Sequence, residues 1–270
     1  MQVSALSVRD ASAGYGGQSA IESIGFDVDG GDILGIVGPN GAGKTTLFRA
    51  ILDLHPHTGT VSICGRCCEA RRALLPLVGY VPQRVSVERG FPATVRDIVS
   101  MGALPQRRLE ACARLAGESG YEWQREYSRM GALDEKVDAA LDAVAMSDLA
   151  GRRIGELSTG EAQRALIAKS LVNDPLLLIL DEPASSVDAG SRERLHAVMR
   201  RLNSELGTTI VWSSHDLDAL ERVATSVACM DRRLVFHGDK DEFFSDEEAV
   251  RSYTEASMQA HMHMERIAVD

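Results

Sequence analysis

The sequence lacks any long hydrophobic run. A membrane-spanning helix needs roughly 20 apolar residues, whereas the longest run here, Leu176–Leu180, has the length of a buried strand. The first residues also lack the basic and then apolar pattern of a secretory signal, so we expect a cytoplasmic protein. Positive charge is not in excess either. The net charge is −10, which argues against binding to a nucleic-acid backbone as the main role.

Cysteine is scarce. The chain has 5 cysteines, an odd number that fits a reducing compartment. Three lie in "CGRCC" (64–68), but no second Cys or His pair stands at the spacing of a structural zinc site. We therefore interpret them as small apolar residues of a strand and turn. His261 and His263 could ligate a metal, but we expect a solvated C-terminal tail there.

Short apolar runs alternate with helical segments along most of the chain. Residues 3–8 and 26–28 are expected to form a small antiparallel element, and buried strands are expected at 32–38, 77–83, 176–180 and 208–215. Strands that alternate with helices favour a mostly parallel sheet with helices on both faces. From about residue 94 to 150 the pattern is helical, which indicates an inserted helical subdomain.

The stretch "GPNGAGKTT" fits the phosphate-binding pattern G-x-x-x-x-G-K-[ST], after an expected strand and before an expected helix. Its glycines let backbone N–H groups face phosphate oxygens, and the helix N-terminus adds its dipole. Lys44 is expected to reach the β- and γ-phosphates, and the Thr45 hydroxyl to bind Mg²⁺. The predicted nucleotide-binding residues of this loop are Gly38, Pro39, Asn40, Gly41, Ala42, Gly43, Lys44, Thr45 and Thr46.

Two adjacent acids follow the apolar run at 176–180. Asp181 stands at the expected C-terminal end of a strand, where ligands bind in open α/β sheets. We expect Asp181 to hold Mg²⁺, usually through water, and Glu182 to orient and deprotonate an attacking water.

Five further features follow one another in a familiar order. They are Tyr15 in "GYGG", Gln83 in "GYVPQ", the stretch "LSTGE" (157–161), Asp188 in "SSVD" and His215 in "SSHD". With the two preceding motifs, they make the chain resemble the ATP-binding subunit of an ABC transporter from residue 3 to about 244.

The resemblance implies an α/β fold: a P-loop NTPase core with flanking helices, a small antiparallel β element and an inserted α-helical subdomain. It places the core at 1–88 and 165–246, the helical subdomain at 89–164 and a tail at 247–270. It also implies ATP hydrolysis with Mg²⁺, by a dimer that encloses two ATP molecules.

The same resemblance implies roles for individual residues. Tyr15 would stack on adenine, and Gln83 would sense the γ-phosphate and Mg²⁺. His215 would contact the γ-phosphate and hold the catalytic water together with Glu182. The implied catalytic residues are Glu182, His215, Gln83 and Lys44, and the implied metal ligands are Thr45, Gln83 and Asp181.

A second set of residues would act across the dimer. Ser158 and the Gly160 N–H would bind the γ-phosphate of a nucleotide held by the opposite subunit, and Asp188 would bridge the two subunits. The stretch "LSTGE" departs from the usual Leu-Ser-Gly-Gly-Gln at Thr159 and Glu161. Thr159 is β-branched where unusual backbone angles could be needed, and Glu161 adds negative charge near the expected ribose. Both could slow turnover.

The stretch from Gly79 to Gly102 resembles the subfamily that drives uptake of zinc, manganese and related metal ions. The resemblance implies an integral membrane permease that docks near Phe91–Met101, a solute-binding protein outside the cytoplasm and no nucleic acid. The ATPase would lie on the cytoplasmic face of the membrane. Residues 103–140 are longer than the subfamily pattern, and "GESGYEWQREYSRMG" has no counterpart there, so we expect a solvated insertion.

Other functions stay open at this stage. Import of an iron chelate or another small solute is the nearest alternative. A soluble ABC-type ATPase of DNA repair or translation is less favoured, because such proteins generally have two cassettes or a long coiled-coil insertion. A P-loop GTPase or small-molecule kinase is disfavoured by "LSTGE", by His215 and by the lack of an NKxD-like run.

Overall fold

The computed structural model describes residues 3–83, 90–120, 132–185, 187–246, 250 and 253. Within these ranges no helix has the length and apolarity needed to cross a membrane. The strands are β1 (Leu6–Tyr15), β2 (Gln18–Val28), β3 (Ile33–Val37), β4 (Thr58–Ile63), β5 (Arg66–Cys67), β6 (Val78–Val81), β7 (Leu177–Leu180), β8 (Thr209–Ser214), β9 (Ser226–Asp231) and β10 (Arg233–Asp239).

Helices separate most of these strands along the chain. They are α1 (Lys44–Ile51), α2 (Cys68–Leu74), α3 (Val95–Ser100), α4 (Gln106–Gly117), α5 (Leu133–Ala143), α6 (Thr159–Leu171), α7 (Ala189–Ser204), α8 (Leu217–Val223) and α9 (Lys240–Ser245). Short 3-10 turns occupy Leu75–Leu77, Ser147–Leu149 and Ile154–Glu156.

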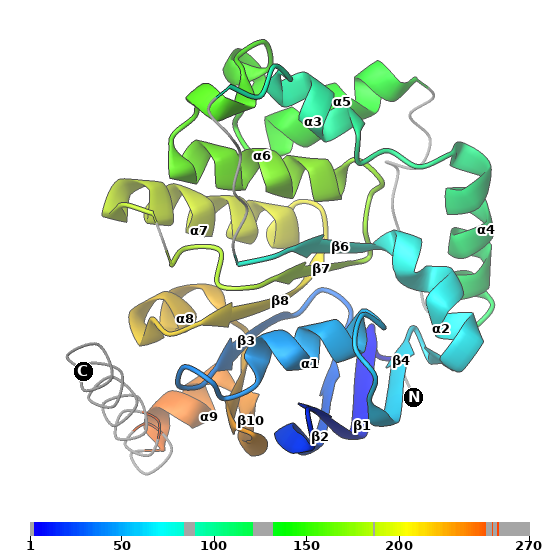
Figure 1. Cartoon of the computed structure of the whole chain (residues 1–270), viewed down its shortest axis with the longest axis vertical. Coiled ribbons are helices and arrows are strands. Elements are labelled where there is room, and N and C mark those ends of the chain that lie inside the picture. Colours follow the sequence, from blue (N-terminus) through cyan, green and yellow to red (C-terminus); the bar gives the residue numbers. More distant parts are fainter. Residues whose placement is uncertain are drawn as a thin grey trace.

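The central sheet has six strands in the order β10-β9-β3-β8-β7-β6, visible through the middle of Figure 1. The pairs from β6 to β9 are parallel, and β10 pairs antiparallel with β9. Because the parallel strands share one direction, the carboxyl ends of β3, β8, β7 and β6 lie side by side at one edge. The loops that follow these four strands therefore converge.

Each face of this sheet has its own hydrophobic core, because successive side chains of a strand point to opposite faces. In β7, Leu178 and Leu180 join one core, and Leu177 and Ile179 join the other. The first core continues into α3, α5, α6, α7 and α8. The second continues into α1, α4 and the antiparallel strands. Apolar residues on both faces explain why these strands read as unbroken hydrophobic runs.

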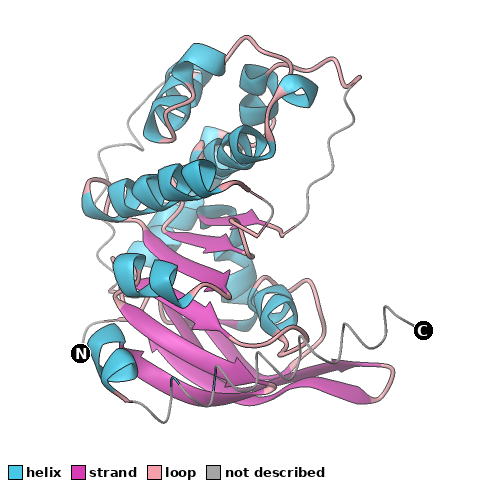
Figure 2. Cartoon of the chain, turned by 90° about the vertical axis from the view of Figure 1, so that its left-hand side faces the viewer, coloured by secondary structure: helices cyan, strands magenta, loops and turns pink. Residues whose placement is uncertain are grey.

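The second sheet is antiparallel, with strand order β2-β1-β4-β5. Its long strands lie at the bottom of Figure 2, and several helices gather at the opposite end of the molecule. The helix α4 falls in the 89–164 segment, yet it packs against α2 through a cluster that includes Leu109, Cys112 and Ala116. The division into subdomains stays a prediction.

The expected α/β fold with a mostly parallel sheet and a small antiparallel element is confirmed. Two expectations need correction or addition. The hairpin β9–β10 completes the central sheet and was not anticipated. Cys64 is buried as interpreted, but Cys67 and Cys68 are exposed, so their interpretation as small apolar residues is wrong. His261, His263 and residues 121–131 of the expected insertion lie outside the described residues.

Candidate functional site: a phosphate-binding loop and two acids at a sheet edge

The phosphate-binding loop connects β3 to α1 in a shape that needs glycine. Gly41 and Gly43 have φ angles of 86° and 97°, which L side chains rarely adopt. A Cβ on Gly43 would lie 2.4 Å from the Ala20 carbonyl oxygen, and one on Gly38 would lie 2.2 Å from the Met230 carbonyl oxygen. No side chain caps α1, so its first N–H groups stay available to an anion.

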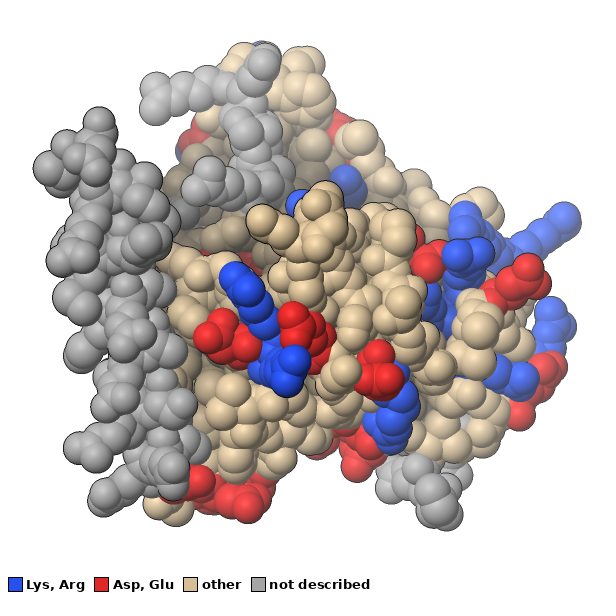
Figure 3. Space-filling model, turned by 60° about the horizontal axis from the view of Figure 1, so that its bottom comes forward, with Lys and Arg blue, Asp and Glu red and all other residues tan. Residues whose placement is uncertain are grey.

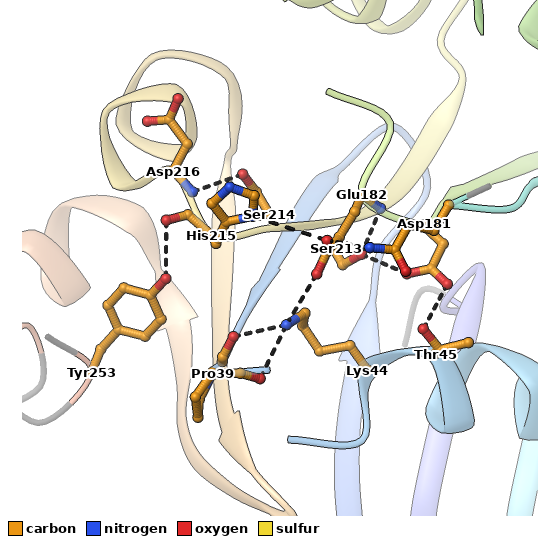
Figure 4. Close-up of polar contacts among 12 residues, drawn as sticks. Pro39, Lys44, Thr45, Asp181, Glu182, Ser213, Ser214, His215, Asp216 and Tyr253 are labelled. Atoms are coloured by element: carbon orange, nitrogen blue, oxygen red, sulfur yellow. Dashed lines mark hydrogen bonds and ion pairs between the residues drawn. The ribbon is translucent and has the colours of Figure 1, made fainter. Parts of the chain in front are cut away.

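Lys44 is buried and lies across its own loop. Its Nζ donates to the carbonyl oxygens of Gly38 at 2.8 Å and Pro39 at 3.3 Å. The same Nζ forms an ion pair with Glu182 Oε1 at 3.3 Å, and the two side chains are only 6% and 9% exposed. The ammonium group thus has three acceptors from the chain, two carbonyl oxygens and one carboxylate oxygen (Figure 4).

Asp181 lies at the end of β7 and is 1% exposed. Its Oδ2 accepts from Thr45 Oγ1 at 2.8 Å, and its Oδ1 accepts from Ser213 Oγ at 2.9 Å. Burial is the main cause that raises the pKa of this carboxyl group, and the two hydrogen bonds oppose it. Thr45 and Asp181 are 136 positions apart in sequence. The adjacency of β3, β8 and β7 brings them together.

Glu182, which follows β7, contacts residues from the end of β6, from β8 and the loop after it, and from α1. Its Oε2 accepts from Gln83 Nε2 at 2.7 Å, and His215 Nδ1 lies 4.0 Å from the same oxygen. Its backbone N–H donates to Ser213 Oγ at 2.8 Å. Its φ angle is +44°, a left-handed conformation that costs a non-glycine residue on the order of 1–3 kcal/mol. Strain of this kind is common where a side chain must be aimed at a reacting group.

The aromatic residue before the core is on the surface. Tyr15 is 47% exposed, and its ring centroid lies 4.3 Å from that of His55. Arg49 of α1 donates a hydrogen bond to its hydroxyl at 3.2 Å, and a hydrogen bond with Thr46 is the main cause that lowers the Tyr15 pKa. An exposed ring beside the phosphate-binding helix is well placed to stack on a base.

The stretch "LSTGE" (157–161), the signature stretch, leads into α6. Ser158 is the N-cap: its Oγ accepts from the Glu161 N–H at 3.3 Å, and its own N–H and hydroxyl both donate to Glu161 Oε2 at 2.8 Å. This capping box gives the Glu161 side chain a structural role at the start of α6. The hydrogen bonds from Ser158 lower the pKa of Glu161. Thr159 is an exposed first helical residue with no positive φ angle, so its backbone angles are ordinary.

Gly160 and Asp188 lie where α6 meets α7. A Cβ on Gly160 would lie 2.6 Å from Ser191 Cβ, so the close approach of the two helices requires glycine. Asp188 is the N-cap of α7, and its Oδ1 accepts from the Ser191 N–H at 2.9 Å. These residues form a second group, separate from the hydrogen-bonded group around Lys44.

Several residues of the site were not predicted. Ser213 joins Asp181 to the Glu182 backbone, and Ser214 Oγ accepts from the Asp216 N–H at 3.0 Å. The sequence signal available for Ser213 and Ser214 was their polarity at the end of an otherwise apolar strand. Tyr253 donates from its hydroxyl to the His215 carbonyl oxygen at 3.1 Å. No local pattern around this lone aromatic residue indicated that contact.

The donor set fits Mg²⁺. A threonine hydroxyl and a buried carboxylate lie 2.8 Å apart, and the Gln83 amide is bonded to the neighbouring carboxylate. Hydroxyl, carboxylate and amide oxygens are the ligands that this hard cation prefers. Among the described residues, no group of three or more His, Cys, Asp or Glu side chains is arranged to hold a metal, so the fit rests on the hydroxyl and amide oxygens together with the carboxylate.

The chain is similar to proteins of one family. The sequence profile described as "ABC transporter" matches residues 21–185. The manganese transport system ATP-binding protein of Halalkalibacterium halodurans is 32% identical, over 91% of this chain and 90% of that protein. The high-affinity zinc uptake system ATP-binding protein of Bacillus subtilis is 34% identical, over 84% and 91%. A Haloferax volcanii protein named "Probable anion import ATP-binding protein" is 36% identical, over 94% and 87%.

Solved structures agree on the fold. A nucleotide-free ATP-binding cassette from an ABC transporter superposes with a TM-score of 0.73 at 21% identity, covering 93% of this chain and 98% of that one. The phosphate-binding loop, the acidic strand end and the helix-capping signature thus occur together in a chain that aligns with its relatives over most of its length. The chain belongs to the ABC transporter family, as one of its ATP-binding, ATP-hydrolysing subunits.

Proposed function

We propose that this subunit hydrolyses ATP to drive import of a divalent metal ion, zinc or manganese, through a membrane permease. The choice of a divalent metal as cargo rests on the similarity to zinc and manganese ATP-binding subunits, over 84% and 91% of this chain. The anion import relative makes an anion the second candidate. A deletion strain tests the choice: slow growth under metal chelation, restored by added zinc or manganese, supports metal import. Normal growth under chelation together with impaired uptake of an oxyanion would make an anion the first candidate and a metal the second.

The contacts of Lys44 suggest how ATP would start the reaction. Lys44 Nζ is held by two carbonyl oxygens and by Glu182 Oε1. A γ-phosphate that attracts the ammonium group would draw it away from Glu182. The freed carboxylate could then accept a proton from water, as that water forms a bond to phosphorus and the β–γ bridging oxygen leaves with ADP.

Positioning and charge neutralisation carry most of such a reaction. Thr45 and Asp181 would hold Mg²⁺, with Gln83 nearby; when bound, this ion neutralises charge on the transferred phosphoryl group. Gln83 and His215 flank the carboxylate of Glu182 from β6 and β8, where they can orient the water. Tyr15, beside α1, would stack on adenine.

Glu182→Gln tests the general base. The amide keeps the shape of the side chain but cannot take a proton at neutral pH. We expect hydrolysis to be lost while ATP binding persists, so that a nucleotide-bound dimer accumulates in size-exclusion chromatography. A variant that hydrolyses ATP at the normal rate would remove Glu182 from this role.

The second group of residues supports a dimer, with each ATP between the loop of one subunit and the signature of the other. Ser158 is exposed at the N-terminus of the 13-residue helix α6, and Gly160 is the second residue of that helix. Asp188 would bridge the subunits. We expect Ser158→Arg to block dimer closure without loss of ATP binding by the monomer. Ser147→Arg places the same charge at an exposed serine outside the signature and should leave closure intact.

The permease is proposed to dock near Phe91–Met101. Thr94 and Asp97 close a capping box at the start of α3, whose Val95 and Val99 are fully buried. Phe91 and Met101 flank the helix and are 43% and 66% exposed, so apolar surface is left for a partner. Met101→Asp should reduce co-purification with the permease while ATP binding is retained, and an unchanged yield of complex would place the docking surface elsewhere.

These partners would put the protein on the cytoplasmic face of the membrane, in a system that also has a solute-binding protein outside the cytoplasm. A nucleic-acid partner is not expected. On the face drawn in Figure 3, most basic side chains stand beside acidic ones instead of forming a continuous tract. Extraction in detergent checks the assembly: co-purification with a multi-span protein supports it, and recovery with ribosomes or DNA would contradict it.

A further inference from the structure

A buried tyrosine reaches the catalytic edge of the sheet from the far end of the chain. Tyr253 is 5% exposed and belongs to the hydrophobic core that also holds Trp212 and Leu220. Its hydroxyl donates a hydrogen bond to the main-chain carbonyl oxygen of His215 at 3.1 Å (Figure 4). Tyr253 and Val250 are the two residues described beyond Asp246, and both have helical backbone.

The position of the His215 side chain depends on its backbone. His215 and Asp216 alone separate β8 from α8. The His215 side chain is 61% exposed, and its Nδ1 lies 4.0 Å from Glu182 Oε2. On one side, the Asp216 N–H donates to Ser214 Oγ, and the Asp216 carboxylate caps α8. The carbonyl oxygen of the same peptide group belongs to His215 and accepts the hydrogen bond from Tyr253.

Together these bonds hold the peptide group between His215 and Asp216 at both its oxygen and its nitrogen. Because the Cα atom of His215 is bonded to this peptide group, a displacement of the peptide would break the bond to Tyr253 and move the base of the imidazole side chain. The phenol ring itself is fixed by core packing, so it supplies a hydrogen-bond donor that moves little.

We propose that Tyr253 is a positioning residue for His215. The inference rests on the proposed role of His215 at the γ-phosphate. Tyr253 does not touch the nucleotide. It acts by keeping the imidazole directed at Glu182 and the water that these two residues hold.

Tyr253→Phe tests this with little change in packing, because only the hydroxyl is removed. Loss of one buried hydrogen bond that directs a reacting group predicts a kcat about fivefold lower. KM for ATP should stay within about twofold, because the residues of the phosphate-binding loop are unchanged. Tyr80→Phe, on β6, removes a phenolic hydroxyl outside this contact and should leave kcat unchanged.

A double-mutant cycle separates positioning from a general structural effect. In a His215→Ala background, Tyr253→Phe should no longer lower the remaining rate, because the side chain it positions is gone. An equal loss in both backgrounds would overturn the inference. A full rate for Tyr253→Phe beside a strongly reduced rate for His215→Ala would also overturn it, while the role of His215 would stand. A full rate for His215→Ala alone would instead defeat the proposed role of His215.

Discussion

Ser213 offers the sharpest test of how the site is held together. Its hydroxyl donates to Asp181 Oδ1 at 2.9 Å and accepts from the Glu182 N–H at 2.8 Å, and the residue is fully buried. Ser213→Ala leaves a buried carboxylate oxygen and a buried N–H without these partners. Each unsatisfied group costs about 1–3 kcal/mol, so for the two groups together we expect the free energy of unfolding to fall by about 2–6 kcal/mol.

Urea denaturation followed by circular dichroism measures this loss. With a slope of about 3 kcal/mol per molar urea, the midpoint should fall by about 0.7–2 M. Activity should fall as well, and half-maximal ATPase activity should require more Mg²⁺, because Asp181 would be less well oriented toward it. Ser214→Ala is the matched control for the urea midpoint, because its hydroxyl accepts only from the Asp216 N–H among the described contacts. Equal midpoints for the two variants would refute the idea that Ser213 joins the two acids.

Three further outcomes follow from other parts of the molecule. Lys44→Ala should lose ATP binding in calorimetry, because the loop would have no ammonium group for the β- and γ-phosphates; micromolar affinity in the variant would count against the assignment. The hydrogen bonds from Ser158 lower the Glu161 pKa from 4.5, so this cap is fully present above that pH and is lost as the pH falls through the folded-state value. The thermal midpoint of Glu161→Gln should therefore change less between pH 7 and about pH 4 than that of the wild type. Finally, a thiol reagent should modify the exposed Cys67 and Cys68 rapidly in the folded protein, whereas rapid reaction of all 5 cysteines would contradict the burial of the other three.

Local pattern was enough to predict the parts of the site that are contiguous in sequence. The phosphate-binding loop could be recognised because its glycines, lysine and threonine act within one turn of chain. The acids at 181 and 182 could be recognised because a buried strand must end before them. In both cases the residues that define the motif also shape its backbone, as the positive φ angles of Gly41 and Gly43 demonstrate.

Features that depend on strand order were out of reach. Ser213 stands beside the two acids because β8 lies between β3 and β7, and nothing near residue 213 encodes that order. Gly160 was expected for its N–H, yet its lack of a side chain also lets α6 approach Ser191. Glu161 was treated as an unfavourable charge, although a serine three residues before a glutamate is itself a capping pattern.

The ion pair between Lys44 and Glu182 has a consequence for nucleotide affinity. On the proposed binding mode, the Glu182 carboxylate would compete with the γ-phosphate for one ammonium group. Binding of ATP would then break this ion pair, and the apparent affinity for ATP would be lowered by the free energy of that exchange. Glu182 would thus weaken ATP binding at low nucleotide concentration, and the same residue is the one proposed as the general base.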